Sequence, residues 1–229
     1  MRPGHVLNLG RVPYLEAWDL QRSLADAVRR REIPDTVMLL EHPPVITLGR
    51  RADESELHIP DGADVEVVET DRGGKSTYHG PGQLVCYPIF DLARHGEDVK
   101  RYCRDLEEAL IRTLAALGVK GERIDGLTGI WVYPPPRKIA SIGVHISKWI
   151  TTHGYALNVD LDPAPFTEWI TACGLEDTAF TTVARELGRP VSVDEVRPHA
   201  VAALAGVFEL ALEEQRLEIG QPAAVADAL

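Results

Sequence analysis

The chain has 229 residues, of which 45% are hydrophobic and 26% are charged. This is enough for one large domain with a substantial core. A formal net charge of -11 disfavours nonspecific nucleic-acid binding, which requires a basic surface. No stretch approaches the roughly eighteen apolar residues of a membrane span, so no membrane association is expected. Three cysteines without a Cys-x-x-Cys pair fit a reducing compartment, and we expect a cytoplasmic protein.

The first half of the chain predicts several short strands, one helix and a glycine-rich segment. Strands are expected at residues 5–10, 36–40, 45–48, 65–68 and 84–90. The helix follows from Pro13 and has one apolar face made of Tyr14, Ala17, Trp18, Leu24, Ala25 and Val28. The glycine-rich segment, residues 72–82, leads directly into the last of these strands.

The second half predicts two long helices and three further strands. The helices are expected over 98–117 and from Ser192, which opens a capping-box pattern. Strands are expected at 129–133, 138–146 and 151–159, and a short helix at 164–170. The chain therefore reads as one mixed α/β domain, a mixed sheet with flanking helices, over residues 1–215. Residues 216–229 are expected to form a loose tail.

The glycine-rich segment is the first candidate site. Gly74-Lys75-Ser76 is similar to the end of a phosphate-binding loop, but that motif needs a glycine where this chain has Glu69, so the match fails. Glycines let a backbone approach a ligand closely and expose its N–H groups. A plain surface turn between two strands is the alternative.

Lys138 opens an apolar strand directly after three prolines. Its side chain could simply extend to solvent, which is common for lysine. In a closed cleft, desolvation would favour the neutral amine and make it a usable base near neutral pH. The sequence leaves both options open.

The remaining candidates are a histidine and a cysteine. His153 precedes Gly154 within a strand, and the other histidines show no metal-ligand spacing, so no metal is predicted. Cys173 precedes Gly174 in a connection where a nucleophile could be presented, although free cysteines are often merely buried. Cys86 and Cys103 lie on apolar faces and read as small core residues.

In order along the chain, these segments resemble the octanoyltransferases of lipoate biosynthesis. The resemblance rests on Arg72-Gly73-Gly74, Tyr78-His79-Gly80-Pro81-Gly82-Gln83, Lys138-Ile139-Ala140-Ser141-Ile142-Gly143, His153-Gly154-Tyr155-Ala156-Leu157-Asn158 and Cys173-Gly174, with Leu40-Glu41-His42-Pro43-Pro44 and Thr47-Leu48-Gly49-Arg50 earlier. It runs from about residue 7 to about residue 212. One departure is Ala172, where the family usually has proline.

The resemblance implies the fold of the biotin and lipoate protein ligase catalytic domain. It implies that Cys173 is the nucleophile that carries the acyl group as a thioester and that Lys138 is its partner, with no cofactor. The implied substrate-binding residues are Arg72, Gly73, Gly74, Lys75, Ser76, Thr77, Tyr78, His79, Ser141, Ile142, Gly143, Gly154, Tyr155 and Ala156. His79 or His153 is a candidate to relay a proton.

The implied reaction transfers an octanoyl group from acyl carrier protein to a lysine. The implied acceptors are the lipoyl domains of 2-oxoacid dehydrogenase complexes and the glycine cleavage H protein. The implied carrier is acidic, so a local basic rim is expected to dock it. Its candidate members are Arg50, Arg51, Arg72, Lys75 and Arg137.

Two rival functions remain open at this point. An ATP-dependent lipoate or biotin protein ligase would share the fold but would form an acyl-adenylate and need no cysteine. A noncatalytic protein that holds a fatty acyl chain would bind lipid without any adduct on Cys173.

Overall fold

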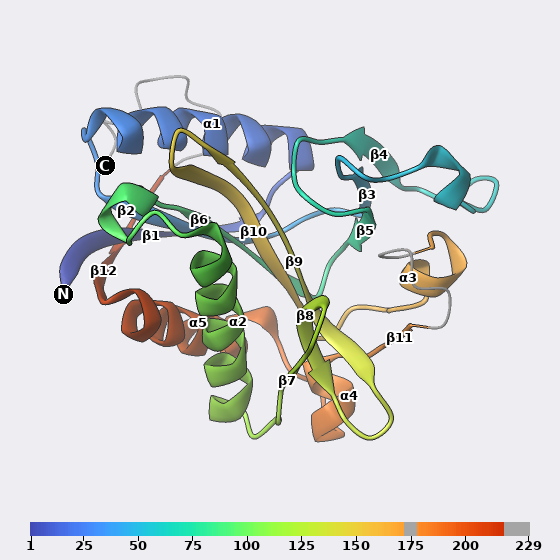
Figure 1. Ribbon diagram of the computed structural model, residues 1–229. Coiled ribbons are helices and arrows are strands. Elements are labelled where there is room, and N and C mark those ends of the chain that lie inside the picture. The colour runs from blue at the N-terminus through green and yellow to red at the C-terminus, as the bar shows by residue number, and fades with distance from the viewer. Residues whose placement is uncertain (172–177, 218–229) are drawn as a thin grey trace.

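A computed structural model describes residues 1–171 and 178–217, and nine strands of this part form one mixed sheet (Figure 1). Its order is β12-β1-β2-β6-β10-β9-β8-β7, and β11 pairs with β9. The strands are β1 (Arg2–Arg11), β2 (Asp35–Glu41), β6 (Gln83–Ile89), β7 (Glu122–Ile124), β8 (Leu127–Val132), β9 (Arg137–Ser147), β10 (Ile150–Asn158), β11 (Ala179–Phe180) and β12 (Leu210–Gln215). β1 runs parallel to β2 and β12, whereas the pairs from β2 to β7 are antiparallel.

A second, smaller sheet lies beside the first and carries the glycine-rich segment. Its order is β4-β3-β5, formed by β3 (Val45–Leu48), β4 (Glu66–Glu69) and β5 (Ser76–His79). The loop from β4 to β5 therefore holds residues 70–75, between this sheet and the β9–β10 ribbon (Figure 1).

Helices cover both faces of the large sheet. On one face lies α1 (Tyr14–Arg30), whose Leu24 and Val28 pack with Leu40 and Val85. On the other face, α2 (Val99–Ala116) and α5 (Val193–Phe208) bury the larger apolar core (Figure 1). The shorter helices are α3 (Pro165–Glu168), α4 (Val183–Leu187) and the 3-10 turns Glu54–Glu56 and Leu92–Arg94.

The mixed α/β fold with flanking helices is confirmed, and so are the three long helices. The side chain of Ser192 accepts a hydrogen bond from the N–H of Glu195 and caps α5, as the capping-box pattern predicts. Pro13 lies one residue before α1, at its N-cap. β12 was not predicted, because its sequence has little apolar alternation and its pairing with β1 is a long-range contact. Residues 218–229, most of the expected tail, lie outside the described residues.

The β9–β10 ribbon has an edge that β8 covers only in part. β8 pairs with β9 at Arg137, Lys138 and Ala140, whereas β10 follows β9 on to Ser147. Farther along, the N–H of Gly73 donates to the carbonyl of Val144 at 2.9 Å. The glycine-rich loop is thus fastened to this edge of β9.

Candidate active site

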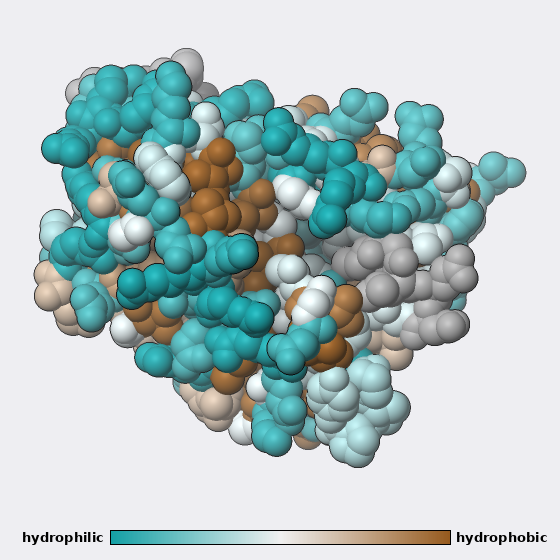
Figure 2. Space-filling view, in the orientation of Figure 1, coloured by the Kyte–Doolittle hydropathy of each residue, from teal (hydrophilic) through white to brown (hydrophobic). Residues whose placement is uncertain are grey.

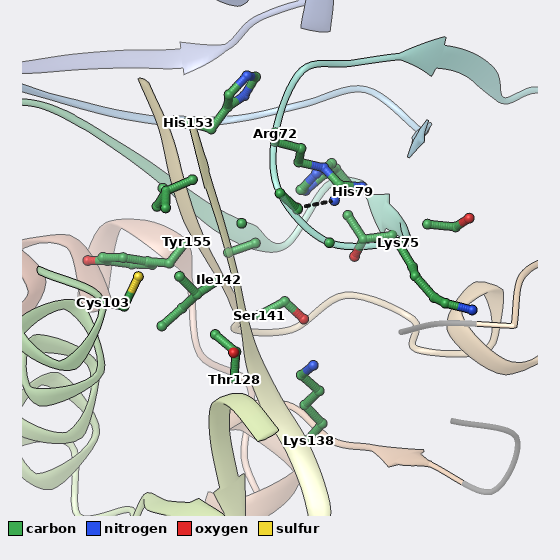
Figure 3. Close-up of a pocket in the computed structure, with 18 of the residues that line it drawn as sticks. Arg72, Lys75, His79, Cys103, Thr128, Lys138, Ser141, Ile142, His153 and Tyr155 are labelled. Atoms are coloured by element: carbon green, nitrogen blue, oxygen red, sulfur yellow. Dashed lines mark hydrogen bonds between the residues drawn. The ribbon is translucent and has the colours of Figure 1, made fainter. Parts of the chain in front are cut away.

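A cavity of about 410 Å³ lies at the partly covered edge of β9, within the range typical of small-molecule sites (Figure 3). Its walls include Lys138 and every substrate-binding residue implied by the resemblance except Tyr78. They are Arg72, Gly73, Gly74, Lys75, Ser76, Thr77, His79, Ser141, Ile142, Gly143, Gly154, Tyr155 and Ala156. Segments far apart in sequence are therefore gathered around one space.

Tyr78 points away from this cavity. Its ring packs against Phe166 and Trp169, with centroid distances of 5.7 and 5.9 Å. Side chains alternate between the two faces of a strand. The side chains of Thr77 and His79 therefore point from β5 toward the cavity, and that of Tyr78 points from the other face of β5. Cys173 lies outside the described residues.

Lys138 is buried in the cavity wall and does not extend to solvent. Its side chain is 4% exposed, and Nζ lies 5.5 Å from the ring centroid of Trp131. Gly129 makes room for it, because a Cβ there would lie 3.0 Å from Lys138 Cε and 2.5 Å from the carbonyl oxygen of Ala140. Lys138 thus presents an amine to an enclosed space.

The glycine-rich loop is held in place by a buried arginine. The Arg72 guanidinium donates to the carbonyl oxygen of Thr47 at 2.6 Å, to its hydroxyl at 2.8 Å and to the carbonyl of Gly73 at 3.1 Å. A Cβ on Gly49 would meet the carbonyl oxygen of Gly74 at 2.5 Å, so only glycine fits there. These contacts place the loop backbone against the cavity.

The same contacts correct the expected basic rim. Arg72 is buried and cannot contact a docking protein. Arg137 is paired with Glu186 at 2.9 Å, and Lys75 with Glu56. Both of these cations remain partly exposed, and Arg50 and Arg51 are exposed beside the glycine-rich loop. Of the five expected members of the rim, only Arg72 is therefore ruled out.

Two tyrosines and a histidine that were not among the predicted site residues form an aromatic cluster with His79. Tyr14 and Tyr87 line the cavity, and His42 lies behind them. His42 Nδ1 donates to the carbonyl of Val12 at 2.7 Å, and Nε2 accepts from the Tyr87 hydroxyl at 2.8 Å. Tyr14 is on the apolar face of a predicted helix and Tyr87 is in a predicted apolar strand, so the sequence could have indicated that both are buried. It could not have indicated that both line the same cavity.

Burial keeps these histidines neutral at pH 7. It lowers the pKa of His42 to about 4 and that of His79 well below its ordinary value, where His42 adds to the effect. His79 Nδ1 donates to the side-chain carbonyl of Gln83 at 2.7 Å, because the Gln83 amide group itself donates to Asn158. This part of the wall is therefore aromatic and uncharged except for Arg72.

His153 reaches the same wall through an unusual backbone conformation. Alternation along β10 would place it on the face of Tyr155, but its φ of +56° turns the side chain toward α1. His153 Nε2 donates to Asp71 at 2.7 Å, and Nδ1 lies 3.4 Å from the Tyr14 hydroxyl. Burial lowers the pKa of His153, opposed by the bond to Asp71.

The residues that line the cavity lie on both sides of the β9–β10 ribbon (Figure 3), and we call the two parts of the cavity the glycine-loop lobe and the α2 lobe. The glycine-loop lobe is lined by Tyr14, Arg72, His79, Tyr87 and His153. The α2 lobe is lined by Cys103, Leu127, Thr128, Ile142 and Tyr155. The two lobes meet around Lys138, Ser141 and Gly143 at the edge of β9. Cys103, expected to be a core residue, is half-buried in the cavity wall, whereas Cys86 is fully buried.

Solved structures with the same fold are named lipoate protein ligase and biotin protein ligase. A bipartite lipoate protein ligase from Thermoplasma acidophilum superposes with a TM-score of 0.75 at 16% identity, covering 95% of this chain and 88% of that one. A biotin protein ligase from Aquifex aeolicus gives a TM-score of 0.51 at 10% identity, covering 91% of this chain and 70% of that one. At these identities the likeness establishes the fold: the catalytic domain of lipoate and biotin protein ligases.

Sequence comparison narrows this class. Residues 13–205 match the lipoyl protein ligase A/B catalytic domain. An octanoyltransferase from Chloroflexus aggregans is 48% identical over 92% of this chain and 97% of its own length. One from Mycobacterium tuberculosis is 52% identical over 89% of this chain and 86% of its own length. The chain belongs to the octanoyltransferases of the lipoyl protein ligase A/B family, and it is an acyltransferase.

Two further observations concern only the described part of the chain. In residues 1–171 and 178–217, no helix is long and apolar enough to cross a membrane. In the same residues, no group of three or more histidine, cysteine, aspartate or glutamate side chains is arranged to hold a metal ion.

Proposed function

We propose that this chain transfers an octanoyl group from acyl carrier protein to a lysine of lipoyl-domain proteins, through a thioester on Cys173. The acceptors are the lipoyl domains of 2-oxoacid dehydrogenase complexes and the glycine cleavage H protein. The observation that carries the proposal is the buried amine of Lys138 in a cavity walled by the other segments of the resemblance. The reaction takes place in the cytoplasm.

In the first half-reaction, Cys173 attacks the carbonyl carbon of the donor thioester. Lys138 accepts the thiol proton, the new C–S bond forms, and the bond to the carrier sulfur breaks. The ammonium of Lys138 then gives the proton to the departing carrier thiolate, which leaves as the thiol. The donor thioester is already activated, so ATP is not required.

In the second half-reaction, the acceptor lysine must attack as a neutral amine. Generating that form at pH 7 costs roughly 4.6 kcal/mol for an amine of ordinary pKa. Lys138 takes the proton that the amine loses as the amide forms, and delivers it to the leaving sulfur of Cys173. Backbone N–H groups near Gly143 or Cys173 are the candidate donors to the oxyanion.

The surroundings of Lys138 support these roles. Phe180 in β11, just beyond the part of the chain that contains Cys173, pairs with Lys138, and Thr181 N–H donates to the Lys138 carbonyl at 3.0 Å. The cavity supplies the space for the acyl chain, and each buried methylene contributes about 0.8 kcal/mol.

Intact-mass measurement tests the proposal directly. The protein is mixed with octanoyl-carrier thioester without ATP, and an adduct of one octanoyl group is expected. Cys173→Ala should abolish the adduct, and Lys138→Ala should slow its formation at least a hundredfold. Lys100→Ala, at an exposed position of α2 outside the cavity, should leave it unchanged.

The rival functions give different results in the same experiment. Acylation of the acceptor that requires ATP and survives Cys173→Ser would identify an adenylate-forming ligase. Octanoate bound without any mass shift on the protein would identify an acyl-binding protein. Either result would refute the proposed transfer.

A further inference from the structure

The two lobes of the cavity differ in how far they open to solvent. At the inner end of the glycine-loop lobe, Tyr14, Arg72, His79, Tyr87 and His153 are each at most 6% exposed, so this end is closed. Gly73, Gly74 and Lys75, which also line this lobe, are partly exposed. In the α2 lobe, Cys103, Leu127 and Ile142 are half-buried and Thr128 is exposed. Figure 2 shows hydrophobic side chains at the surface along this side of the ribbon, next to the hollow.

The proposed donor has two parts that need different sites. Its acyl chain ends in a methyl group and fits a closed lobe. On the other side of the thioester, a pantetheine arm continues to a carrier protein at the surface, so it needs an open passage. Lys138 lies where the two lobes meet, which is where the thioester between these two parts would lie.

The edge of β9 offers backbone hydrogen bonds to such an arm. The Val144 carbonyl points to this edge, since it accepts from Gly73 N–H. Backbone polar groups alternate sides along a strand, so Ile142 directs its own N–H and C=O to the same edge. Ile142 lies between Ala140, where pairing with β8 ends, and Val144, where the glycine-rich loop is attached. Pantetheine contains two amides separated by short alkyl segments, which suit a strand edge flanked by apolar side chains.

We infer that the α2 lobe is the binding site for the pantetheine arm of the donor, with the Ile142 backbone bonded to one of its amides, and that the acyl chain occupies the glycine-loop lobe. This inference rests on the proposed function and adds a subsite to it. The glycine-loop lobe suits an uncharged chain because its histidines are neutral and its one cation, Arg72, is bonded to Thr47 and Gly73.

Filling the α2 lobe tests the inference. Cys103→Trp projects a large ring into the lobe from α2. Ala115→Trp is the matched control, because Ala115 is an exposed residue of the same helix that does not line the cavity. Two donors with the same acyl chain are compared: S-octanoyl-pantetheine and S-octanoyl-2-mercaptoethanol, which has no arm. The rate constant for acylation of Cys173 is measured by intact mass.

We expect Cys103→Trp to lower kcat/KM for the pantetheine donor at least tenfold. For the armless donor, kcat/KM should stay within twofold of the value for the unmodified protein. Ala115→Trp should change kcat/KM for either donor by no more than twofold. Leu127→Trp, which fills the lobe from β8, should repeat the pattern of Cys103→Trp.

Three outcomes would overturn the inference. If acylation becomes slower with both donors and the shorter S-hexanoyl donors restore the rate, the lobe holds the acyl chain. If both tryptophan variants lower the acylation rate equally for the two donors, and S-hexanoyl donors do not restore it, the lobe does not select for the arm. No change in either donor shows that the lobe is not occupied. Failure of the proposed function is seen separately, as the absence of any Cys173 adduct in the unmodified protein with the armless donor.

Discussion

Asp71 and His153, 82 positions apart in sequence, form a hydrogen bond of 2.7 Å that links the glycine-rich loop to strand β10. The second oxygen of Asp71 lies 3.6 Å from His145 on β9. The hydrogen bond with His153 is the main reason that the pKa of Asp71 is lowered. The carboxylate therefore ties the loop to both strands of the ribbon, next to Arg72.

Removing this carboxylate should loosen the loop and slow acyl transfer. A hydrogen bond to a charged group contributes about 1.5–3 kcal/mol, so Asp71→Ala should lower kcat/KM about tenfold or more. Asp71→Asn keeps an acceptor for His153 Nε2 and should recover much of the rate. The measurement is octanoyl transfer to an acceptor domain, with thermal unfolding as the control for folding. If Asp71→Ala were as active as the unmodified protein, the Asp71–His153 hydrogen bond would not be needed to hold the loop in its active position.

The buried histidines should make the protein acid-sensitive. The pKa of His42 falls from about 6.5 in the unfolded chain to about 4 in the folded protein, so the unfolded state binds the proton more tightly. Stability is full above pH 6.5 and is lost as the pH falls from 6.5 toward 4, by on the order of 3 kcal/mol for this residue alone.

Urea unfolding at pH 7 and pH 4.5 measures this loss. His42→Gln supplies the control, because glutamine can donate to the Val12 carbonyl and accept from Tyr87 without titrating. This variant should show a flatter dependence on pH between 4.5 and 7. An unchanged slope would mean that His42 does not contribute to the acid sensitivity.

Gly143 should not tolerate even one added carbon. A Cβ there would lie 3.0 Å from the carbonyl oxygen of Gly73 and 3.3 Å from Arg72 Cδ, so Gly143→Ala should push the loop away from β9. We expect a loss of activity of tenfold or more. Gly206→Ala is the matched control, since among the described residues only the tip of Arg112 lies near its Cβ, at 3.7 Å. Gly206 is in the last turn of α5, so the substitution should stabilise the protein by no more than the roughly 0.5–1 kcal/mol of a helix interior and leave activity unchanged.

Docking of an acidic carrier should depend on Arg50 and Arg51, the exposed members of the expected rim. Reversing both charges to glutamate should slow acylation by octanoyl-carrier protein several-fold at low salt and weaken its dependence on ionic strength. Acylation by S-octanoyl-2-mercaptoethanol should not change, because this donor has no protein to dock. Wild-type rates with the carrier at low salt would rule out this rim.

The sequence by itself determined the fold class, the three long helices and most residues of the candidate site. Helical periodicity and the capping box at Ser192 are local patterns, and local patterns can be read without tertiary contacts. The ordered motifs led to Lys138 and to the two glycine-containing segments that meet it. Whether Lys138 was buried or exposed could not be read, because a lysine that opens a strand can do either.

Only the tertiary structure decided how these segments are arranged around the cavity. Arg72, proposed for a docking surface, proved to be a buried support of the loop, because its hydrogen-bond partner Thr47 belongs to a strand 25 positions away. Strand alternation turned Tyr78 out of the cavity, whereas a positive φ turned His153 into it. The edge of β9 that lines the cavity is left uncovered because its pairing with β8 ends at Ala140, and long-range strand pairing of this kind has no local signal in the sequence.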